Sequence, residues 1–436
     1  MRFNAVTAEN VFQILDPVGD FQIGLVIRFD GRIQERILEK ALLLSLDQVP
    51  VIGARFVPGW WRGYWEPLDR SFFKVERILT TSPDTDAKAF FTKPLNHLDG
   101  PLVRAAIFSS DTDTLCLNVS HFAADASGVK AYAALLSSIY NRLLTDPGYL
   151  PDPADPPSRS LRQVTQRFSF KQKLGIARQI LSDLAENRPF PRPCTLPGFC
   201  SSNEKRVYVT RRIEKALFQQ VQAWSGRHGA TINDVLMAAF FRAFAAMHRT
   251  DLRRSPSTCN RRMIVTADLR RYLPPDQGHR LISSLSGWVP VELGIGPEEA
   301  MEKTCLTVSK IMQHKKQGYL GLGILMAGAV LIKVSPLALS VACGRILATL
   351  AAGMRIVAPS FTNMGRIDPA SLHFEGTHIL DAFLVPPVVY PPVFGCGVSG
   401  FRDTLILSAG ICEPGFQSET VEELFEIVLN ELATLT

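Results

Sequence analysis

The stretch HFAADASG, residues 121–128, places a histidine and an aspartate four positions apart. The preceding run TLCLNVSHF alternates in polarity, which is typical of a β-strand with one apolar face. His121 falls on the apolar side of that strand, where desolvation disfavours the charged imidazolium. Because a neutral imidazole can accept a proton, His121 is a candidate general base.

Two roles are open to Asp125. Its carboxylate could bond His121 and orient the imidazole, or it could turn away and pair with an arginine that fixes the loop. A purely structural histidine is a further interpretation, because the five-residue pattern is common. Metal binding is not indicated, since the residues around the pair supply no third ligand.

The composition narrows the class of protein. The chain has 436 residues, of which 46% are hydrophobic, so it is long enough for two globular domains. Its formal net charge is +6, but acidic and basic residues are mixed along most of the length, which argues against nucleic-acid binding. The N-terminal residues lack an apolar core with a small-residue cleavage site, and we therefore expect a cytoplasmic protein.

The cysteines are scattered through the chain, without a close CxxC pair or a His/Cys cluster at metal spacing. We expect no metal, no bound cofactor and no disulfide framework. The following cysteines are expected to be reduced and mostly buried: Cys116, Cys194, Cys200, Cys259, Cys305, Cys343, Cys396 and Cys412.

The elements that must position the histidine and the aspartate alternate between strand and helix patterns. A segment with apolar residues at helical spacing, 129–144, begins soon after the pair. Proline-rich breaks at 146–158 and 189–203 divide the chain. We predict an α/β fold (an α+β sandwich) of two lobes with these bounds: 1–188 for the N-terminal lobe, including a linker region at 146–188, and 204–436 for the C-terminal lobe.

Two segments bear on membrane contact. Residues 161–181 have the pattern of a basic amphipathic helix, which could rest on an anionic membrane or cover the domain junction. Residues 319–344 carry a single charge, that of Lys333, and are long enough to span a bilayer. Because Lys333 and Pro336 interrupt this run, we expect two helices broken near Pro336, buried or presented as a lipid-facing patch, with Lys333 reaching solvent.

The ordered set of motifs resembles the HxxxD acyltransferases, the chloramphenicol-acetyltransferase-like superfamily that includes peptide-synthetase condensation domains, wax ester synthases and alcohol acetyltransferases. GPLVRAAIF followed by LCLNVSHFAADASGV is similar to the approach to the family's HHxxxDG signature. ATINDVLMAAF, VTADLRRYLP and PSFTNMGRID then follow in the family's order. The resemblance covers nearly all of the chain and implies two chloramphenicol-acetyltransferase-like lobes with an active-site tunnel at their junction.

The resemblance also implies roles for individual residues. His121 would take a proton from a hydroxyl or amine acceptor as the acceptor attacks a thioester carbonyl. Asp125 would be structural and would pair with an arginine, Arg270 being the first candidate and Arg271 the second. Trp288 is expected near the tunnel wall or in ordinary core. Candidate donors to the oxyanion, which turn chemistry would also explain, are Ser360, Thr362 and Asn363.

Two positions depart from the family's pattern. Ser120 stands in place of the first histidine of the signature, and Ala126 follows the aspartate where glycine is usual, with Gly128 two residues later. We count Ser120 and Gly128 among the candidate substrate-binding residues. The loss of the first histidine argues against a standard peptide-synthetase condensation domain.

We therefore expect a stand-alone acyltransferase that uses acyl-CoA or an acyl-carrier-protein thioester as co-substrate and a small-molecule alcohol or amine as acceptor. Two alternatives stay open at this point. One is a non-catalytic condensation-like module that binds a carrier or a lipid intermediate. The other is a membrane-associated lipid or wax ester synthase, in peripheral contact with the inner face of the membrane.

Overall fold

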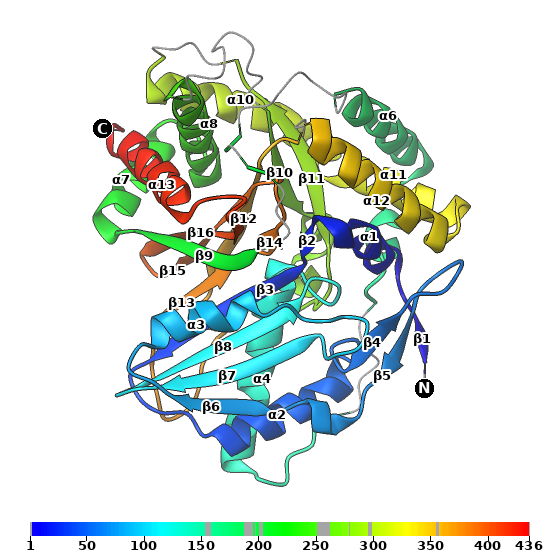
Figure 1. Cartoon of the computed structure of the whole chain (residues 1–436), viewed down its shortest axis with the longest axis vertical. Helices are drawn as coiled ribbons and strands as arrows, with labels where there is room; N and C mark the ends of the chain where they lie inside the picture. Colours follow the sequence, from blue (N-terminus) through cyan, green and yellow to red (C-terminus); the bar gives the residue numbers. More distant parts are fainter. Residues whose placement is uncertain are drawn as a thin grey trace.

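The computed structural model describes residues 2–152, 158–186, 195–196, 198–199, 204–250, 262–278, 280–294, 299–354 and 357–435. Two lobes are stacked along the long axis of the molecule, and each is built on its own β-sheet (Figure 1). Helices cover the sheets and form a further layer along one side. The predicted α/β class and the two-lobed arrangement are confirmed.

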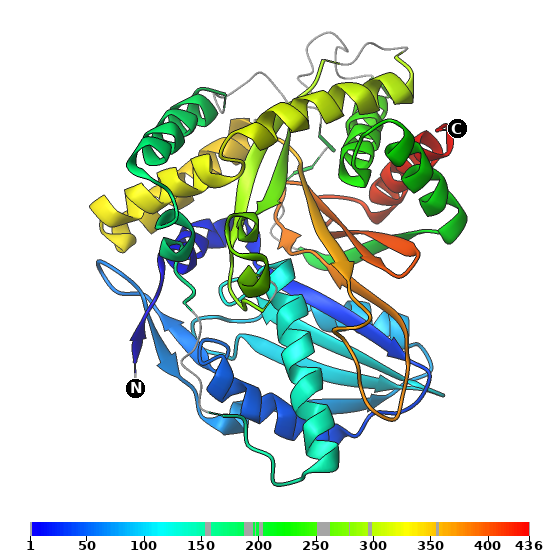
Figure 2. The same cartoon turned by 180° about the vertical axis from the view of Figure 1, so that it is seen from behind.

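The first lobe is built on a five-stranded sheet in the order β13-β3-β8-β7-β6. Its strands are β3 (Gln22–Phe29), β6 (Val75–Leu79), β7 (Val103–Ser109), β8 (Asp113–Ser120) and β13 (Ile379–Val385). Helices α2 (Glu35–Gln48) and α4 (Ala126–Thr145) pack on one face of this sheet, which Figure 2 shows from the front. Helix α3 (Pro83–Thr92) packs on the other face.

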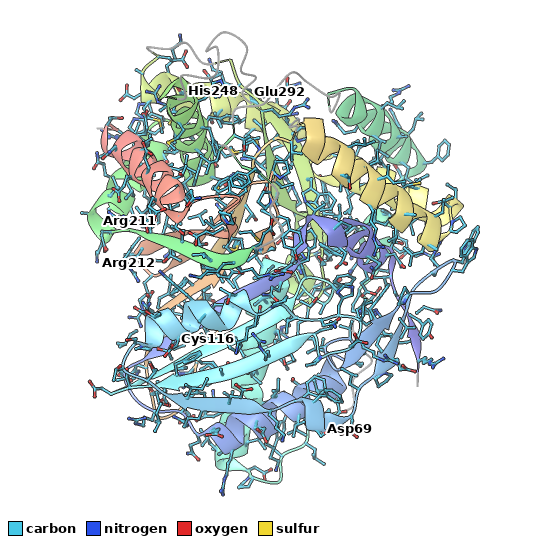
Figure 3. All side chains as sticks on the ribbon, in the orientation of Figure 1. Asp69, Cys116, Arg211, Arg212, His248 and Glu292 are labelled. Atoms are coloured by element: carbon cyan, nitrogen blue, oxygen red, sulfur yellow. The ribbon has the colours of Figure 1, made fainter. Side chains whose placement is uncertain are left out.

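Strand β8, which leads to His121, is buried along its whole length. Leu115 and Leu117 face the core under α2 and α4, as the alternation predicted. The opposite side of the strand is covered as well. There Cys116, labelled in Figure 3, packs in a second cluster with Phe91 of α3 and Tyr208 from the other lobe. Both faces of the strand therefore help to hold its end in place.

The second lobe is built on an eight-stranded sheet in the order β11-β10-β12-β15-β16-β14-β2, with β9 paired to β16. Its strands are β2 (Gly19–Asp20), β9 (Lys205–Ile213), β10 (Arg262–Asp268), β11 (Ser286–Glu292), β12 (Ser360–Ile367), β14 (Val388–Val389), β15 (Gly395–Phe401) and β16 (Thr404–Glu413). The helices that enclose its hydrophobic core are α7 (Lys215–Arg227), α8 (Ile232–Thr250), α10 (Met301–Gln317) and α13 (Ser418–Ala433).

The lobes exchange strands. β13 comes late in the chain but pairs with β3 in the first sheet, and β2 comes early but pairs with β14 in the second. Asp381 of β13 joins the lobes, because its carboxylate accepts a hydrogen bond from Arg28 of β3 at 2.9 Å and another from Arg212 of β9. Figure 3 shows Arg212 at the boundary between the lobes. β13 thus lies within the range predicted for the C-terminal lobe, 204–436, and β2 within the range predicted for the N-terminal lobe, 1–188, although each pairs in the sheet of the other lobe.

The side layer consists of α1 (Thr7–Leu15), α5 (Arg162–Thr165), α6 (Phe170–Glu186), α11 (Leu322–Val334) and α12 (Leu337–Met354). Below it lies a small sheet of β1 (Phe3–Asn4), β5 (Tyr64–Pro67) and β4 (Ala54–Val57). The remaining short helices are η1 (Asp16–Val18), η2 (Arg70–Phe72), η4 (Leu269–Tyr272) and α9 (Pro275–Gly278).

The predicted break near Pro336 is confirmed, because α11 ends at Val334 and α12 begins at Leu337. Lys333 is exposed near the end of α11, as expected. Within the described residues, no single helix is both long and apolar enough to cross a membrane. Among the helices that the structure describes, only α7 and α8 taken together, with a bend of 111° between them, match a span by length and composition.

The single helix predicted over residues 161–181 is wrong, because α5 and α6 are separate. Leu174 and Leu181 of α6 are exposed, which does not fit an amphipathic helix that buries its apolar residues. Instead, α6 turns Ile176 inward, where it packs in a cluster with Leu322 of α11.

The cysteines among the described residues carry free thiols. Burial is as expected for four of them, and Cys343 on α12 is exposed. The buried ones are Cys116, Cys305, Cys396 and Cys412. Cys194, Cys200 and Cys259 lie outside the described residues.

A close backbone contact between Gly287 of β11 and Gly321 holds α11 on the second sheet. A Cβ on Gly287 would lie 2.0 Å from the Gly321 carbonyl oxygen. We therefore expect Gly287→Ala to lower the free energy of unfolding, measured by urea denaturation, by about 2 kcal/mol. The control is Gly226→Ala in α7, where an added Cβ meets nothing within 4 Å. That variant should have an unchanged or slightly higher free energy of unfolding. An unchanged free energy of unfolding in Gly287→Ala would contradict the tight contact.

Candidate active site

His121 is the first residue after β8, and its ring lies at the junction of the two lobes. Its main-chain N–H donates to the Phe21 carbonyl at 2.8 Å. Its Nδ1 lies 3.1 Å from Ser284 Oγ of the second lobe. The Phe12 ring of α1 packs against the imidazole, with 4.5 Å between ring centroids. Three separate parts of the chain thus fix the position of this side chain.

Burial lowers the pKa of His121 below its usual value, and the nearby carboxylate of Asp125 offsets only part of this effect. The imidazole is therefore neutral near pH 7. In the tautomer in which Nδ1 donates its hydrogen to Ser284, Nε2 keeps a lone pair that can accept a proton. A general base requires this state.

Of the two roles open to Asp125, the structure shows the arginine pair. Asp125 is the N-cap of α4, and its Oδ1 accepts a hydrogen bond from the Gly128 N–H at 2.9 Å. Its Oδ2 accepts from Arg270 at 2.8 Å, from the Leu285 N–H at 2.7 Å and from the Ser286 hydroxyl at 3.2 Å. The carboxylate is thus fully occupied by donors, most of them in the second lobe.

Both members of this pair are buried and charged. Burial by itself would raise the pKa of Asp125, but the charge and hydrogen bonds of Arg270, together with two main-chain donors, hold the pKa below its usual value. For Arg270, burial by itself would lower the pKa, but the two carboxylates that it contacts, Asp125 and Asp268, raise the pKa above its usual value. The pair is an ion pair at neutral pH.

Arg270 also organises the segment that contacts the imidazole. It lies in η4, directly after β10. Its Nη2 donates to the carbonyls of Leu281 and Ser283, at 3.1 Å and 2.8 Å. Because Ser284 follows directly, the pair between Arg270 and Asp125 fixes the hydroxyl that lies against His121.

A cavity of about 140 Å³ lies between the lobes, and His121 lines it. Its walls are mostly apolar, and Trp288 of β11 is one of them, as expected for a tunnel wall. Ser360 and Thr362 of β12 line the same cavity, and the Ser360 hydroxyl donates to the Phe394 carbonyl at 3.3 Å. The Thr362 hydroxyl lies 2.8 Å from that of Thr266 on β10. The cavity therefore brings one imidazole together with several side chains that carry hydroxyls.

Asn363, the third predicted donor to the oxyanion, lies on the other side of β12, because successive residues of a strand face opposite ways. Its Nδ2 donates to Asn233 Oδ1 of α8 at 3.1 Å, and its Oδ1 accepts from the Gly365 N–H at 2.9 Å. Asn363 therefore does not line this cavity. Turn chemistry, the alternative given for this residue, fits these contacts.

Three other predicted residues do not line this cavity. The Ser120 side chain is buried, and its hydroxyl accepts from the Phe122 N–H at 3.4 Å. A Cβ on Gly128 would lie 2.8 Å from the Ser283 carbonyl oxygen, so this glycine permits the close approach of α4 to the second lobe. Arg271, the second candidate partner of the aspartate, is exposed and stacks on a neighbouring tyrosine.

The sequence interpretation missed Ser284, Thr266 and Lys130. The polar run within LISSLSG could have pointed to Ser284, since hydroxyls in an apolar segment often bond a buried partner. Lys130 of α4 gives no such signal, because its Nζ donates to the carbonyl of Met364, 234 positions away, at 2.8 Å. Burial lowers the pKa of Lys130.

Residues that could hold a charged ligand lie next to the histidine cavity. Within the described residues, no three His, Cys, Asp or Glu side chains gather in a group that could hold a metal ion. A cavity of about 560 Å³, which we call the basic cavity, is lined by more basic than acidic side chains. The basic ones are Lys130, Arg270, Arg271 and Arg366, and the acidic ones are Asp268 and Asp368. Ser127 lines this basic cavity and Ala126 lines the histidine cavity, so the first turn of α4 separates the two.

No family model and no curated protein sequence matches the chain. Solved structures match it over its whole length. The first condensation domain of the calcium-dependent antibiotic synthetase, in complex with a substrate analogue, is 18% identical with a TM-score of 0.71, over 100% of this chain and 96% of that one. Polyketide synthase associated protein 5 from Mycobacterium tuberculosis is 15% identical with a TM-score of 0.66, over 99% and 98%.

A mutant of the starter condensation domain of rhizomide synthetase, in complex with C8-CoA, is 15% identical with a TM-score of 0.68, over 100% of this chain and 96% of that one. At these identities the likeness establishes the fold. The chain has the two-lobed fold of condensation domains, which the HxxxD resemblance implied.

We predict that the effects of Asp125→Ala and Arg270→Ala on stability are not additive. Each substitution leaves a buried charge without its partner, so each should lower the free energy of unfolding by about 3–5 kcal/mol. The double variant should lose less than the sum of the two. Urea denaturation of the four proteins measures this coupling.

The matched control is the pair of Asp47 and Arg70, whose side chains are 55% and 56% exposed. Its coupling energy should be below about 1 kcal/mol. Strictly additive losses for Asp125 and Arg270 would show that their contact contributes nothing specific.

Proposed function

We propose that the chain is an acyltransferase that moves an acyl group from an acyl-CoA or an acyl-carrier-protein thioester to a hydroxyl or amine acceptor. One observation carries the proposal: His121, whose pKa is lowered by burial, lines a cavity between two lobes, while Asp125 is engaged by Arg270. The shared fold supports it, since one structure with this fold holds C8-CoA.

In the proposed reaction, Nε2 of His121 takes the proton of the acceptor while the acceptor oxygen or nitrogen bonds to the thioester carbonyl carbon. Negative charge develops on the carbonyl oxygen of the tetrahedral intermediate. The hydroxyls of Ser360 and Thr362 are candidate donors to this oxygen. The C–S bond then breaks, and the leaving thiolate takes the proton back from the imidazolium, which restores the site.

The basic cavity supports a donor that carries phosphate. Lys130, Arg271 and Arg366 offer positive charge on the far side of the first turn of α4. The histidine cavity, at about 140 Å³, is smaller than a site for a whole drug-sized ligand. We therefore propose that only the thioester and the acceptor group enter it, while the phosphate-bearing arm of the donor lies in the basic cavity. This activity would be cytoplasmic and would involve no nucleic acid.

A second candidate function is a condensation-like module that binds a carrier or a lipid intermediate without catalysis. The serine at position 120, where the family's signature has its first histidine, favours this alternative. The two candidates differ in one measurable property, because only the first consumes an acyl thioester.

We predict that His121→Ala lowers turnover by about 10²–10⁴-fold, because the acceptor loses its general base. Mass spectrometry of products from a panel of acyl-CoAs with alcohols and amines provides the measurement. His314→Ala, a change at an exposed histidine, is the control and should retain full turnover. Wild-type turnover in His121→Ala would show that His121 is not the general base. If the parent protein forms no product from any donor, the non-catalytic binding module is favoured.

A further inference from the structure

One side of the molecule carries an unusual concentration of exposed apolar side chains, which we call the outer face. It consists of the outward sides of α11 and α12 and the tip of the hairpin between β4 and β5 (Figure 1). Its residues are Trp60, Trp61, Val330, Leu331, Val334, Leu339, Ile346, Leu347 and Leu350. Within α12, Leu339, Ile346 and Leu350 recur at helical spacing, so they form one stripe.

The hairpin and the helices form a continuous surface. The Leu337 N–H donates to the Trp61 carbonyl and the Ala338 N–H to the Trp60 carbonyl, both at 3.2 Å. The Arg62 guanidinium donates to the Ser335 carbonyl at 3.2 Å. The hairpin tip is therefore fixed at the break between α11 and α12.

The outer face exposes more large apolar side chains than the rest of the described surface. The exposed fraction is 73% for Trp60, 71% for Val334 and 65% for Leu347. Half of the strongly exposed large hydrophobic residues in the described part of the chain lie on this face. Apolar patches that are this extensive mark sites of interaction.

The exposed charged side chains of α11 and α12 are all basic. No aspartate or glutamate occurs from Lys303 to Ile367, the stretch that contains α11 and α12. None occurs over residues 156–182 either, which include most of α6. Helix α6 packs on α11 and lies beside it in Figures 1 and 2. The exposed basic side chains of these helices are Lys171, Lys173, Arg178, Lys333 and Arg345.

We propose that the outer face docks on the surface of an anionic lipid bilayer. The apolar stripe of α12 and the two tryptophans would enter the boundary between headgroups and acyl chains, where indole rings are favoured. The basic side chains would meet the lipid phosphates, and the stems of the lysines would lie along the apolar surface. The outer face does not include His121 or the cavity that it lines, so this inference does not depend on the proposed function.

The charge also argues against a second copy of this chain as the occupant. Two copies that met through their outer faces would bring Lys333, Arg345 and the basic residues of α6 together with like charges. Like charges that face each other across an interface are unfavourable. An anionic membrane supplies both the apolar layer and the opposite charge.

Sedimentation with lipid vesicles tests the proposal on the full chain without substrate. We expect binding to vesicles of phosphatidylcholine mixed with phosphatidylglycerol and little binding to phosphatidylcholine alone. Leu347→Glu/Leu350→Glu and Trp60→Ser/Trp61→Ser should each abolish binding, because they remove the inserted groups. Lys171→Glu/Lys173→Glu should weaken it at least about 25-fold, since each lysine near such a surface is worth about a factor of five.

Matched changes elsewhere on the surface serve as controls. Leu79→Glu replaces a leucine that is 81% exposed on the first lobe, and Lys74→Glu/Lys88→Glu reverses two exposed lysines there. Both should bind vesicles like the parent protein. Equal unfolding midpoints in urea for all variants show that each one is folded.

Several results would overturn the proposal. These are no binding to anionic vesicles, equal binding to neutral vesicles, or binding that survives the Trp60→Ser/Trp61→Ser change. Sedimentation velocity without lipid adds another. A dimer that Leu347→Glu/Leu350→Glu dissociates would assign the outer face to a second copy of the chain instead.

Discussion

The buried ion pair between Asp125 and Arg270 is the contact on which the candidate site depends. Each partner follows a strand of a different sheet, β8 or β10, so the pair joins the lobes beside His121. Because two charges are costly to desolvate, the net contribution of such a pair to the stability of the fold is modest. The main effect of the pair is to position the site, since it holds the first turn of α4 against the segment that carries Ser284.

The packing that buries His121 also connects it to the side layer. Phe12 of α1 contacts the imidazole, and α1 in turn packs on α12. A Cβ on Gly344 of α12 would lie 2.7 Å from Ile14, so the two helices are in close contact. A single helix thus separates the candidate general base from the apolar outer face. The desolvation that lowers the pKa of His121 therefore depends on α1, which belongs to the same side layer as the helices of the outer face.

The sequence predicted those parts of the site that local pattern and motif order determine. The sequence pattern predicts His121 at the end of a strand, Asp125 at the start of a helix and Arg270 just after a strand. The structure places all three in these positions. Asn363 lies on the other side of β12, and a motif alone does not say which side of a strand faces the cavity. Phe12 could not be predicted, since its contact with the imidazole depends on packing between helices and sheets far apart in the chain.

The central claim is that the junction between the lobes keeps His121 neutral and ready to accept a proton. NMR titration of the protein with ¹³Cε1-labelled histidine tests this directly, with His121→Gln used to assign the signal. The pKa of His121 should lie below about 6.5, the value of a solvated histidine. A pKa at or above that value would mean that the imidazole is not desolvated, and would contradict the role given to it here.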